Sequence, residues 1–164
     1  MPESNNQNFN HLKIHTQYSI CEGAIKIEKL KDFCKENKIP CLGLSDTSNL
    51  FGALEFAENI SKVGTQPIIG TQIYFKFEDT TGLLPLIALN QKGYKRIIEL
   101  SSKSYLENDA LSDPHLDIRE LLTKTDGVLL LSGTIQGLFG KLFEKGRLEE
   151  ISKIYKDLSL ILHD

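Results

Sequence analysis

Residues 41–77 read CLGLSDTSNLFGALEFAENISKVGTQPIIGTQIYFKF, and this stretch decides the predicted fold. It opens with a short apolar run, 41–45, that is typical of a buried strand. A helix follows, which Ser48 or Asn49 can cap and whose apolar residues recur on one face: Leu50, Ala53, Leu54, Ala57 and Ile60. After Gly64, a second apolar run at 67–77 predicts another strand. The stretch therefore predicts a parallel βαβ unit.

The same alternation continues on both sides of this unit. Helices are predicted at 26–38, 93–106, 117–123 and 135–157, the last of them broken near Gly146. Further strands are predicted at 11–15, 83–89, 127–131 and 158–162. Five or six mostly parallel strands with outer helices indicate an α/β fold, either an open doubly wound sheet or part of a β/α barrel. Because a crossover helix should cover the apolar strand at 158–162, we expect a fold that is truncated at its C-terminal side.

Composition restricts the chain to a few classes of protein. Its 164 residues suit one domain, and its 40% hydrophobic content is too high for a disordered chain. The net charge of −3 argues against a free-standing nucleic-acid-binding protein. No apolar run approaches the roughly 18 residues of a membrane span. Residues 1–9 are polar and lack the pattern of a signal peptide, which predicts a flexible lead, a domain at 10–164 and a cytoplasmic location.

Several kinds of site are excluded by their missing motifs. Cys21, Cys34 and Cys41 form no C-x-x-C pair, so neither a disulfide framework nor a thiolate zinc site is predicted, and a reducing compartment is favoured. The chain has no G-x-x-x-x-G-K-[ST] loop and no G-x-G-x-x-G after a strand, which excludes the usual phosphate-binding and dinucleotide-binding loops.

Polar residues at the ends of the predicted strands are the candidates for a site. In parallel β/α folds, ligands bind beyond the carboxyl ends of the strands, where His15, Asp46 and the segment 132–134 are placed. Two interpretations remain open from spacing alone. His15, Glu22 and Asp46 can converge on a divalent metal, or His15 and Asp46 simply hydrogen-bond to neighbouring loops.

Four stretches resemble one family. They are FNHLKIHTQYSICEGA (9–24), LGLSDTSNLFGALEFAENISKVGTQPIIG (42–70), ALNQKGYKRIIELSSKSY (88–105) and GVLLLSGTIQG (127–137). Together they are similar to the N-terminal polymerase-and-histidinol-phosphatase (PHP) domain of bacterial replicative DNA polymerase III alpha subunits, over roughly residues 9–162. The most specific element is the L-[ST]-D-x-x-N-L-F-G-A-L-E-F block followed by P-I-I-G.

This resemblance implies both a fold and a type of site. The full domain of the family is a seven-stranded β/α barrel, of which this chain would form an incomplete part. In members that keep the metal site, the barrel holds up to three divalent ions and hydrolyses phosphoesters. The family's last two ligands lie beyond position 164.

The chain departs from the family's ligand pattern at most positions. Lys13 stands where the first His of the H-x-H start is usual, and Glu22 where Asp is usual, whereas His15 and Asp46 are retained. Thr47, Gln72, Leu83 and Thr134 stand in place of a His, a Glu, a His and a Cys. An ammonium group repels divalent cations and an amide lacks the charge that they need. The resemblance thus implies a degenerate site with no catalytic residue, in which Lys13 forms an ion pair with Asp46 or Glu22.

We expect no cofactor in this segment, because so few ligands remain. Weak residual binding of zinc, manganese or magnesium would use His15, Glu22 and Asp46. The parent polymerases of the family use magnesium, but their palm domain, which holds that ion, aligns with no part of this chain.

The resemblance implies two alternative functions. In the first, the chain is a scaffold that packs on the rest of the alpha subunit, docks the proofreading exonuclease subunit and meets DNA only through the parent DNA-directed DNA polymerase, with no membrane partner. In the second, it is a stand-alone metal-dependent phosphoesterase that uses His15, Glu22 and Asp46. A domain without any ligand is a third, less specific interpretation.

Overall fold

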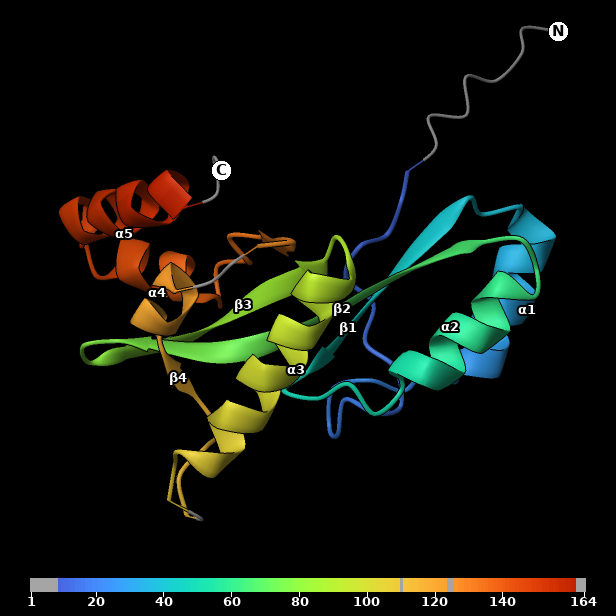
Figure 1. The fold of residues 1–164 in the computed structure, drawn as a ribbon, viewed down its shortest axis with the longest axis horizontal. Helices are drawn as coiled ribbons and strands as arrows, with labels where there is room; N and C mark the ends of the chain where they lie inside the picture. Colours follow the sequence, from blue (N-terminus) through green and yellow to red (C-terminus); the bar gives the residue numbers. More distant parts are fainter. Residues whose placement is uncertain (1–8, 110, 124–125, 162–164) are drawn as a thin grey trace, which may run out of the picture.

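The fold is built on one five-stranded sheet with helices packed against it (Figure 1). The computed structural model describes residues 9–109, 111–123 and 126–161. Its elements are α1 (Ile27–Asn37), β1 (Cys41–Thr47), α2 (Ala53–Ser61), β2 (Gln66–Phe77), β3 (Thr80–Ala88), α3 (Gln91–Leu106), β4 (Leu116–Asp117), the 3-10 helix η1 (Ile118–Leu122), β5 (Val128–Leu130), α4 (Leu138–Glu144) and α5 (Leu148–Ile161). The predicted α/β class with outer helices is confirmed.

The sheet is mixed, with β2 as its longest strand. β1 and β2 run parallel, which confirms the predicted βαβ unit, and their register pairs Thr47 with Gln72. β2 also pairs with β3, and β3 pairs with β5, both antiparallel, whereas the short β4 runs parallel to β2. β3 therefore does not continue the parallel pattern. Only Glu78 and Asp79 connect it to β2, and a parallel crossover needs a dozen residues or more.

Two predicted strands are wrong. Residues 11–15 form only an isolated bridge, in which Ile14 pairs with Leu44. The run 158–162 belongs to α5 as far as Ile161, and residue 162 lies outside the described residues. Its apolar residues continue a helical spacing, since Ile154 and Leu158 are both buried four positions apart. The predicted lead at 1–9 also lies outside the described residues, except for Phe9.

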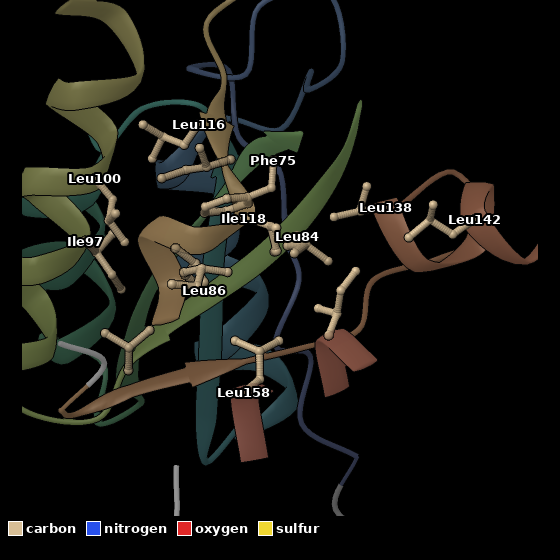
Figure 2. Close-up of a cluster of buried hydrophobic side chains, with 14 residues drawn as sticks. Phe75, Leu84, Leu86, Ile97, Leu100, Leu116, Ile118, Leu138, Leu142 and Leu158 are labelled. Atoms are coloured by element: carbon tan, nitrogen blue, oxygen red, sulfur yellow. The ribbon is translucent and has the colours of Figure 1, made fainter. Parts of the chain in front are cut away.

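Two buried apolar clusters attach the helices to the sheet. One cluster joins α1 and α2 to β1 and includes Leu42, Leu44 and Phe56. The other joins β2 and β3 to the helices that follow them, as Figure 2 shows for Phe75, Leu84, Leu86, Ile97, Leu100, Leu116, Ile118, Leu138, Leu142 and Leu158. In Figure 1, α1 and α2 lie beside the β1 end of the sheet, and α4 lies near β3.

The packing determines which side chains face away from these helices. Successive side chains in a strand point to opposite faces. Since Leu42 and Leu44 pack toward α1 and α2, Ser45 and Thr47 point to the other face of β1. Gln72, the register partner of Thr47, points to the same face. We call this the inner face of the sheet, and it carries part of the candidate site.

Candidate functional site

The segment 16–22 lies against the ends of β1 and β2 and forms two hydrogen-bonded groups there. The first is centred on Asp46, which is fully buried. Its Oδ1 accepts hydrogen bonds from the Thr16 amide at 2.6 Å and from Ser19 Oγ at 2.6 Å. Its Oδ2 accepts from Thr16 Oγ1 at 2.7 Å. The carboxylate is thus held by three neutral donors, of the kind that satisfy a buried charge.

The second group is a chain of three side chains on the inner face. Gln72 Nε2 donates to Thr47 Oγ1 at 2.7 Å, and Thr47 Oγ1 donates to Glu22 Oε2. The Thr47 amide also donates to Ser19 Oγ at 3.0 Å, which connects this group to Asp46. The site therefore joins residues that are about 25 to 30 positions apart in the sequence through uncharged donors.

His15 lies next to these groups on the inner face. The bridge between Ile14 and Leu44 places His15 opposite Ser45. Burial lowers the pKa of His15, and the nearby Lys13 lowers it further, whereas Glu22, Asp46 and a hydrogen bond with the Ser45 backbone act in the opposite direction. The imidazole is therefore largely uncharged at neutral pH. Its Nδ1 atom is buried without a hydrogen-bond partner among the described residues.

The predicted ion pair of Lys13 is not formed. Lys13 is exposed, and among the residues that the structure describes it makes no salt bridge with Asp46 or Glu22. The physical reason is that both carboxylates already accept hydrogen bonds from hydroxyl groups. The exposed ammonium gains more from water than from an already satisfied partner.

Leu83 and Thr134 lie farther along the sheet. Leu83 pairs with Tyr74 on β2 and bridges to Gly137. Thr134 is exposed and closes a turn, because its Oγ1 accepts from the Gln136 amide at 3.3 Å. Within the described part of the chain, neither residue hydrogen-bonds to the groups around Asp46 and Thr47. The structure thus joins Glu22, Asp46, Thr47 and Gln72 by hydrogen bonds and places His15 beside them. Leu83 shares the inner face with Gln72 through its pairing with Tyr74 but offers no polar group, and Thr134 lies in an exposed turn.

The side chains around Asp46 do not supply the ligands of a multinuclear metal centre. Such a centre needs several charged or imidazole ligands for each ion. Here the Asp46 carboxylate accepts three internal hydrogen bonds and the Glu22 carboxylate accepts one from Thr47. Gln72 contributes only a neutral amide. Across residues 9–109, 111–123 and 126–161, no group of three or more His, Cys, Asp or Glu side chains is positioned to hold a metal ion. This set of side chains therefore provides no basis for a chemical step through a metal.

Sequence reasoning missed the residues that hold Asp46. Thr16 and Ser19 are fully buried hydroxyl residues in the stretch HTQYS. Tyr18 positions this stretch, since its hydroxyl donates to Glu55 at 2.7 Å and its carbonyl accepts from Asn49 at 2.9 Å. The only signal in the sequence is the spacing of two hydroxyl residues directly after a candidate ligand, and that spacing is too common to identify a site.

The length and hydrophobicity of the helices were compared with those of membrane-spanning helices. Among the described residues, no helix is both long and apolar enough to cross a membrane.

Comparison with known proteins gives consistent results over the whole chain. The model of the PHP domain family matches residues 11–164. DNA polymerase III subunit alpha of Caulobacter vibrioides is 33% identical over 177 aligned residues, which cover 100% of this chain and 15% of that protein. The protein of the same name from Rickettsia felis is 35% identical over 157 residues, covering 95% of this chain and 13% of its own length. The chain therefore spans only about a seventh of these relatives.

Similarity to solved structures is more distant. An amidohydrolase from Chromobacterium violaceum, solved with bound sulfate and no metal, superposes with a TM-score of 0.48 and 16% sequence identity. The superposition covers 58% of this chain and 32% of that one.

Proposed function

The chain belongs to the PHP domain family, and from this premise we propose that it is a scaffold and docking module of a bacterial replicative DNA polymerase, not a catalyst in itself. Sequence identity of 33% to 35% with proteins named DNA polymerase III subunit alpha supports the assignment to that branch of the family. One observation carries the scaffold role. The Asp46 carboxylate is occupied by Thr16 and Ser19 and is not left open to a cation.

The proposed partners follow from the same relatives. A module of this kind packs on the rest of the polymerase alpha subunit and acts on DNA only through it, with magnesium held elsewhere in that protein. We include the proofreading exonuclease subunit as a docking partner and the cytoplasm as the location. The names of the relatives support the assignment of this chain to a polymerase subunit. Docking of the exonuclease is a more specific proposal, which these names do not address.

Binding to the exonuclease tests the docking role. Full-length alpha subunit, the same protein lacking residues 1–164, and the 164-residue chain by itself are each titrated with purified exonuclease in a calorimeter. Docking through this module predicts strong binding by the full-length protein and at least tenfold weaker binding after the deletion. Equal affinity of the full-length and deleted proteins would overturn the proposal.

A point variant separates the scaffold role from chemistry at the site. Full-length alpha subunit carrying Asp46→Asn keeps one side-chain acceptor for the donors of Thr16 and Ser19. The scaffold role predicts unchanged exonuclease affinity and unchanged primer extension by this variant wherever the protein stays folded, as judged by circular dichroism. A selective loss of phosphoester hydrolysis in this variant would instead favour an enzymatic role.

We also propose that this segment holds no resident metal. Elemental analysis of the purified chain, followed by assays of a generic phosphoester with manganese or zinc, tests this directly. Asp46 and Thr47 both accept hydrogen bonds from neutral groups. We therefore expect no stoichiometric metal in the purified chain and no turnover of the phosphoester. Stoichiometric metal that disappears in His15→Ala would support the alternative, a stand-alone phosphoesterase.

A further inference from the structure

Three buried polar atoms near the site have no hydrogen-bond partner among the described residues. They are His15 Nδ1, Ser45 Oγ and Gln72 Oε1. Ser45 is fully buried and Gln72 is 2% exposed. Buried polar atoms in folded proteins almost always have a hydrogen-bond partner, which is either protein or ordered water. Each of the three atoms therefore needs a hydrogen-bond partner that the described residues do not supply.

The register of the sheet places these three residues on the same face. His15 is opposite Ser45 because Ile14 bridges to Leu44. Ser45 and Thr47 share the inner face of β1, and Gln72 is the register partner of Thr47 on β2. The three residues therefore come from three neighbouring segments and point away from α1 and α2. Gln72 lies two positions along β2 from Gly70, the register partner of Ser45, so its long side chain has to reach back toward Ser45.

The hydrogen bonds of Thr47 fix which atom of the Gln72 amide is unpartnered. Thr47 Oγ1 uses its only hydrogen to reach Glu22, so it has to accept the bond from Gln72. The nitrogen of the amide must then face Thr47, and the oxygen remains free as an acceptor. The site thus offers one acceptor from Gln72, one hydroxyl group that can donate and accept, and one imidazole nitrogen.

The charge of the surroundings decides which ligand these atoms suit. The three atoms belong to neutral groups, and the nearest carboxylates of Asp46 and Glu22 already accept hydrogen bonds. A hard divalent cation needs charged oxygen ligands, which are not offered here. A small neutral molecule that both donates and accepts hydrogen bonds matches the set, and buried waters typically make about three such bonds.

We propose that His15, Ser45 and Gln72 form a binding site for one ordered water molecule, which cross-links the segment before β1 to β1 and β2. The water donates to Gln72 Oε1 and exchanges hydrogen bonds with the Ser45 hydroxyl and the His15 imidazole. The proposal goes beyond the docking role and does not depend on it.

The sign of one mutational effect tests the water site. If Ser45 Oγ binds a water, Ser45→Ala removes that bond and lowers the melting temperature of the 164-residue chain. If Ser45 Oγ is a truly unpartnered atom, the same change removes a buried polar group that costs stability, and the melting temperature rises. Ser104→Ala is the matched control. Ser104 is fully buried too, and its hydroxyl donates to the Ser101 carbonyl at 2.8 Å, so this change should lower the melting temperature in either case.

A crystal structure provides the second, independent measurement. We expect a peak of electron density within about 3 Å of all three atoms in the wild-type chain, with no anomalous signal at the zinc or manganese edge. The peak should weaken or shift in Ser45→Ala. A raised melting temperature for Ser45→Ala, a site without density, or an anomalous peak at this position would each overturn the proposal.

Discussion

Two regions of the molecule hold acidic side chains in opposite ways. At the ends of β1 and β2, the buried carboxylate of Asp46 is held by the neutral donors of Thr16 and Ser19. At the turn between β2 and β3, the exposed Glu78 and Asp79 are held by the cations Lys145 and Arg147. Asp46 thus has neutral partners at a buried position, whereas Glu78 and Asp79 have charged partners at a position where water screens the pairs.

This difference shows how a buried acidic residue can be satisfied without a cation. The resemblance to the PHP family implied a metal ligand at Asp46, whereas in the structure this residue fastens the segment 16–19 to β1. An acidic residue in a family position is therefore no proof of metal binding, and the hydrogen-bond donors around it have to be identified. Four variants test this contrast.

The largest effect is expected from Asp46→Ala. The change leaves the Thr16 amide and the hydroxyls of Thr16 and Ser19 buried without an acceptor. We expect the free energy of unfolding to fall by about 3 kcal/mol, measured by urea denaturation. Asp46→Asn is the control and should lose clearly less, because its amide oxygen still accepts. A loss as small as that of a surface substitution would contradict the structural role of Asp46.

Gln72→Glu is expected to have the second largest effect. It places a carboxyl group at a 2% exposed position, one threonine away from Glu22. Burial and repulsion should destabilise the chain by about 2 kcal/mol at pH 7. Both causes raise the pKa of the introduced carboxyl, so the loss should shrink as the pH falls and the group becomes neutral.

Divalent ions sharpen this second test. If the inner face lacks the ligands for a cation, manganese or zinc should not restore the stability of Gln72→Glu, as monitored by thermal denaturation. Gln72→Met is the control, because it keeps the size of the side chain without the charge. Restoration by the metal would show that one carboxylate is enough to recreate a cation site.

Arg147→Ala should have a smaller effect that depends on salt. Arg147 contacts Glu78, Asp79 and Glu150, and its guanidinium lies 5.7 Å from the centre of the Phe77 ring. We expect the urea midpoint to fall, and the fall to become smaller in high salt because these pairs are screened. The effect of Asp46→Ala should not change with salt. Arg119→Ala, whose side chain is 80% exposed, is the control and should leave the midpoint unchanged.

The smallest effect is a pH dependence at Asp79. A hydrogen bond from Lys145, assisted by Thr80 and Arg147, lowers the pKa of Asp79 from 3.8 to about 2. Since the pKa is lower in the folded state, the contribution of this carboxylate is complete above about pH 4 and is lost as the pH falls through about 2. Asp79→Asn should therefore be less stable than the wild type at pH 7, and the two melting curves should converge toward pH 2. A difference that stays constant with pH would contradict this assignment.

The sequence predicted the local parts of the fold well. The unit β1–α2–β2 follows from the spacing of apolar residues within about 35 positions, and the bounds of α1 and α3 follow in the same way. The apolar run after position 157 is helical, although its sequence predicts a strand, because a short run fits both a strand and a buried helix face. The direction of β3 was not predicted, since the turn at Glu78 and Asp79 carries neither Gly nor Asn, the usual signals of a tight hairpin.

The site was predictable only in part. The resemblance to the PHP family identified five positions that the structure brings together, including Asp46 and Gln72. It did not predict the partners of Asp46, because the hydroxyls of Thr16 and Ser19 reach it across 27 to 30 positions of sequence. It also predicted an ion pair for Lys13 that is absent among the described residues. Hydrogen bonds between distant segments depend on how the chain folds back, which no local pattern encodes.

β2 has a consequence for the dynamics of the whole chain. Its first half pairs with β1 and its second half with β3, and only Gly70, Thr71 and Gln72 have register partners in both of these strands. Each of the two apolar clusters lies beside a different half. If either half opens, these three residues keep the other neighbour, so backbone amides there should be among the last in the chain to exchange with heavy water.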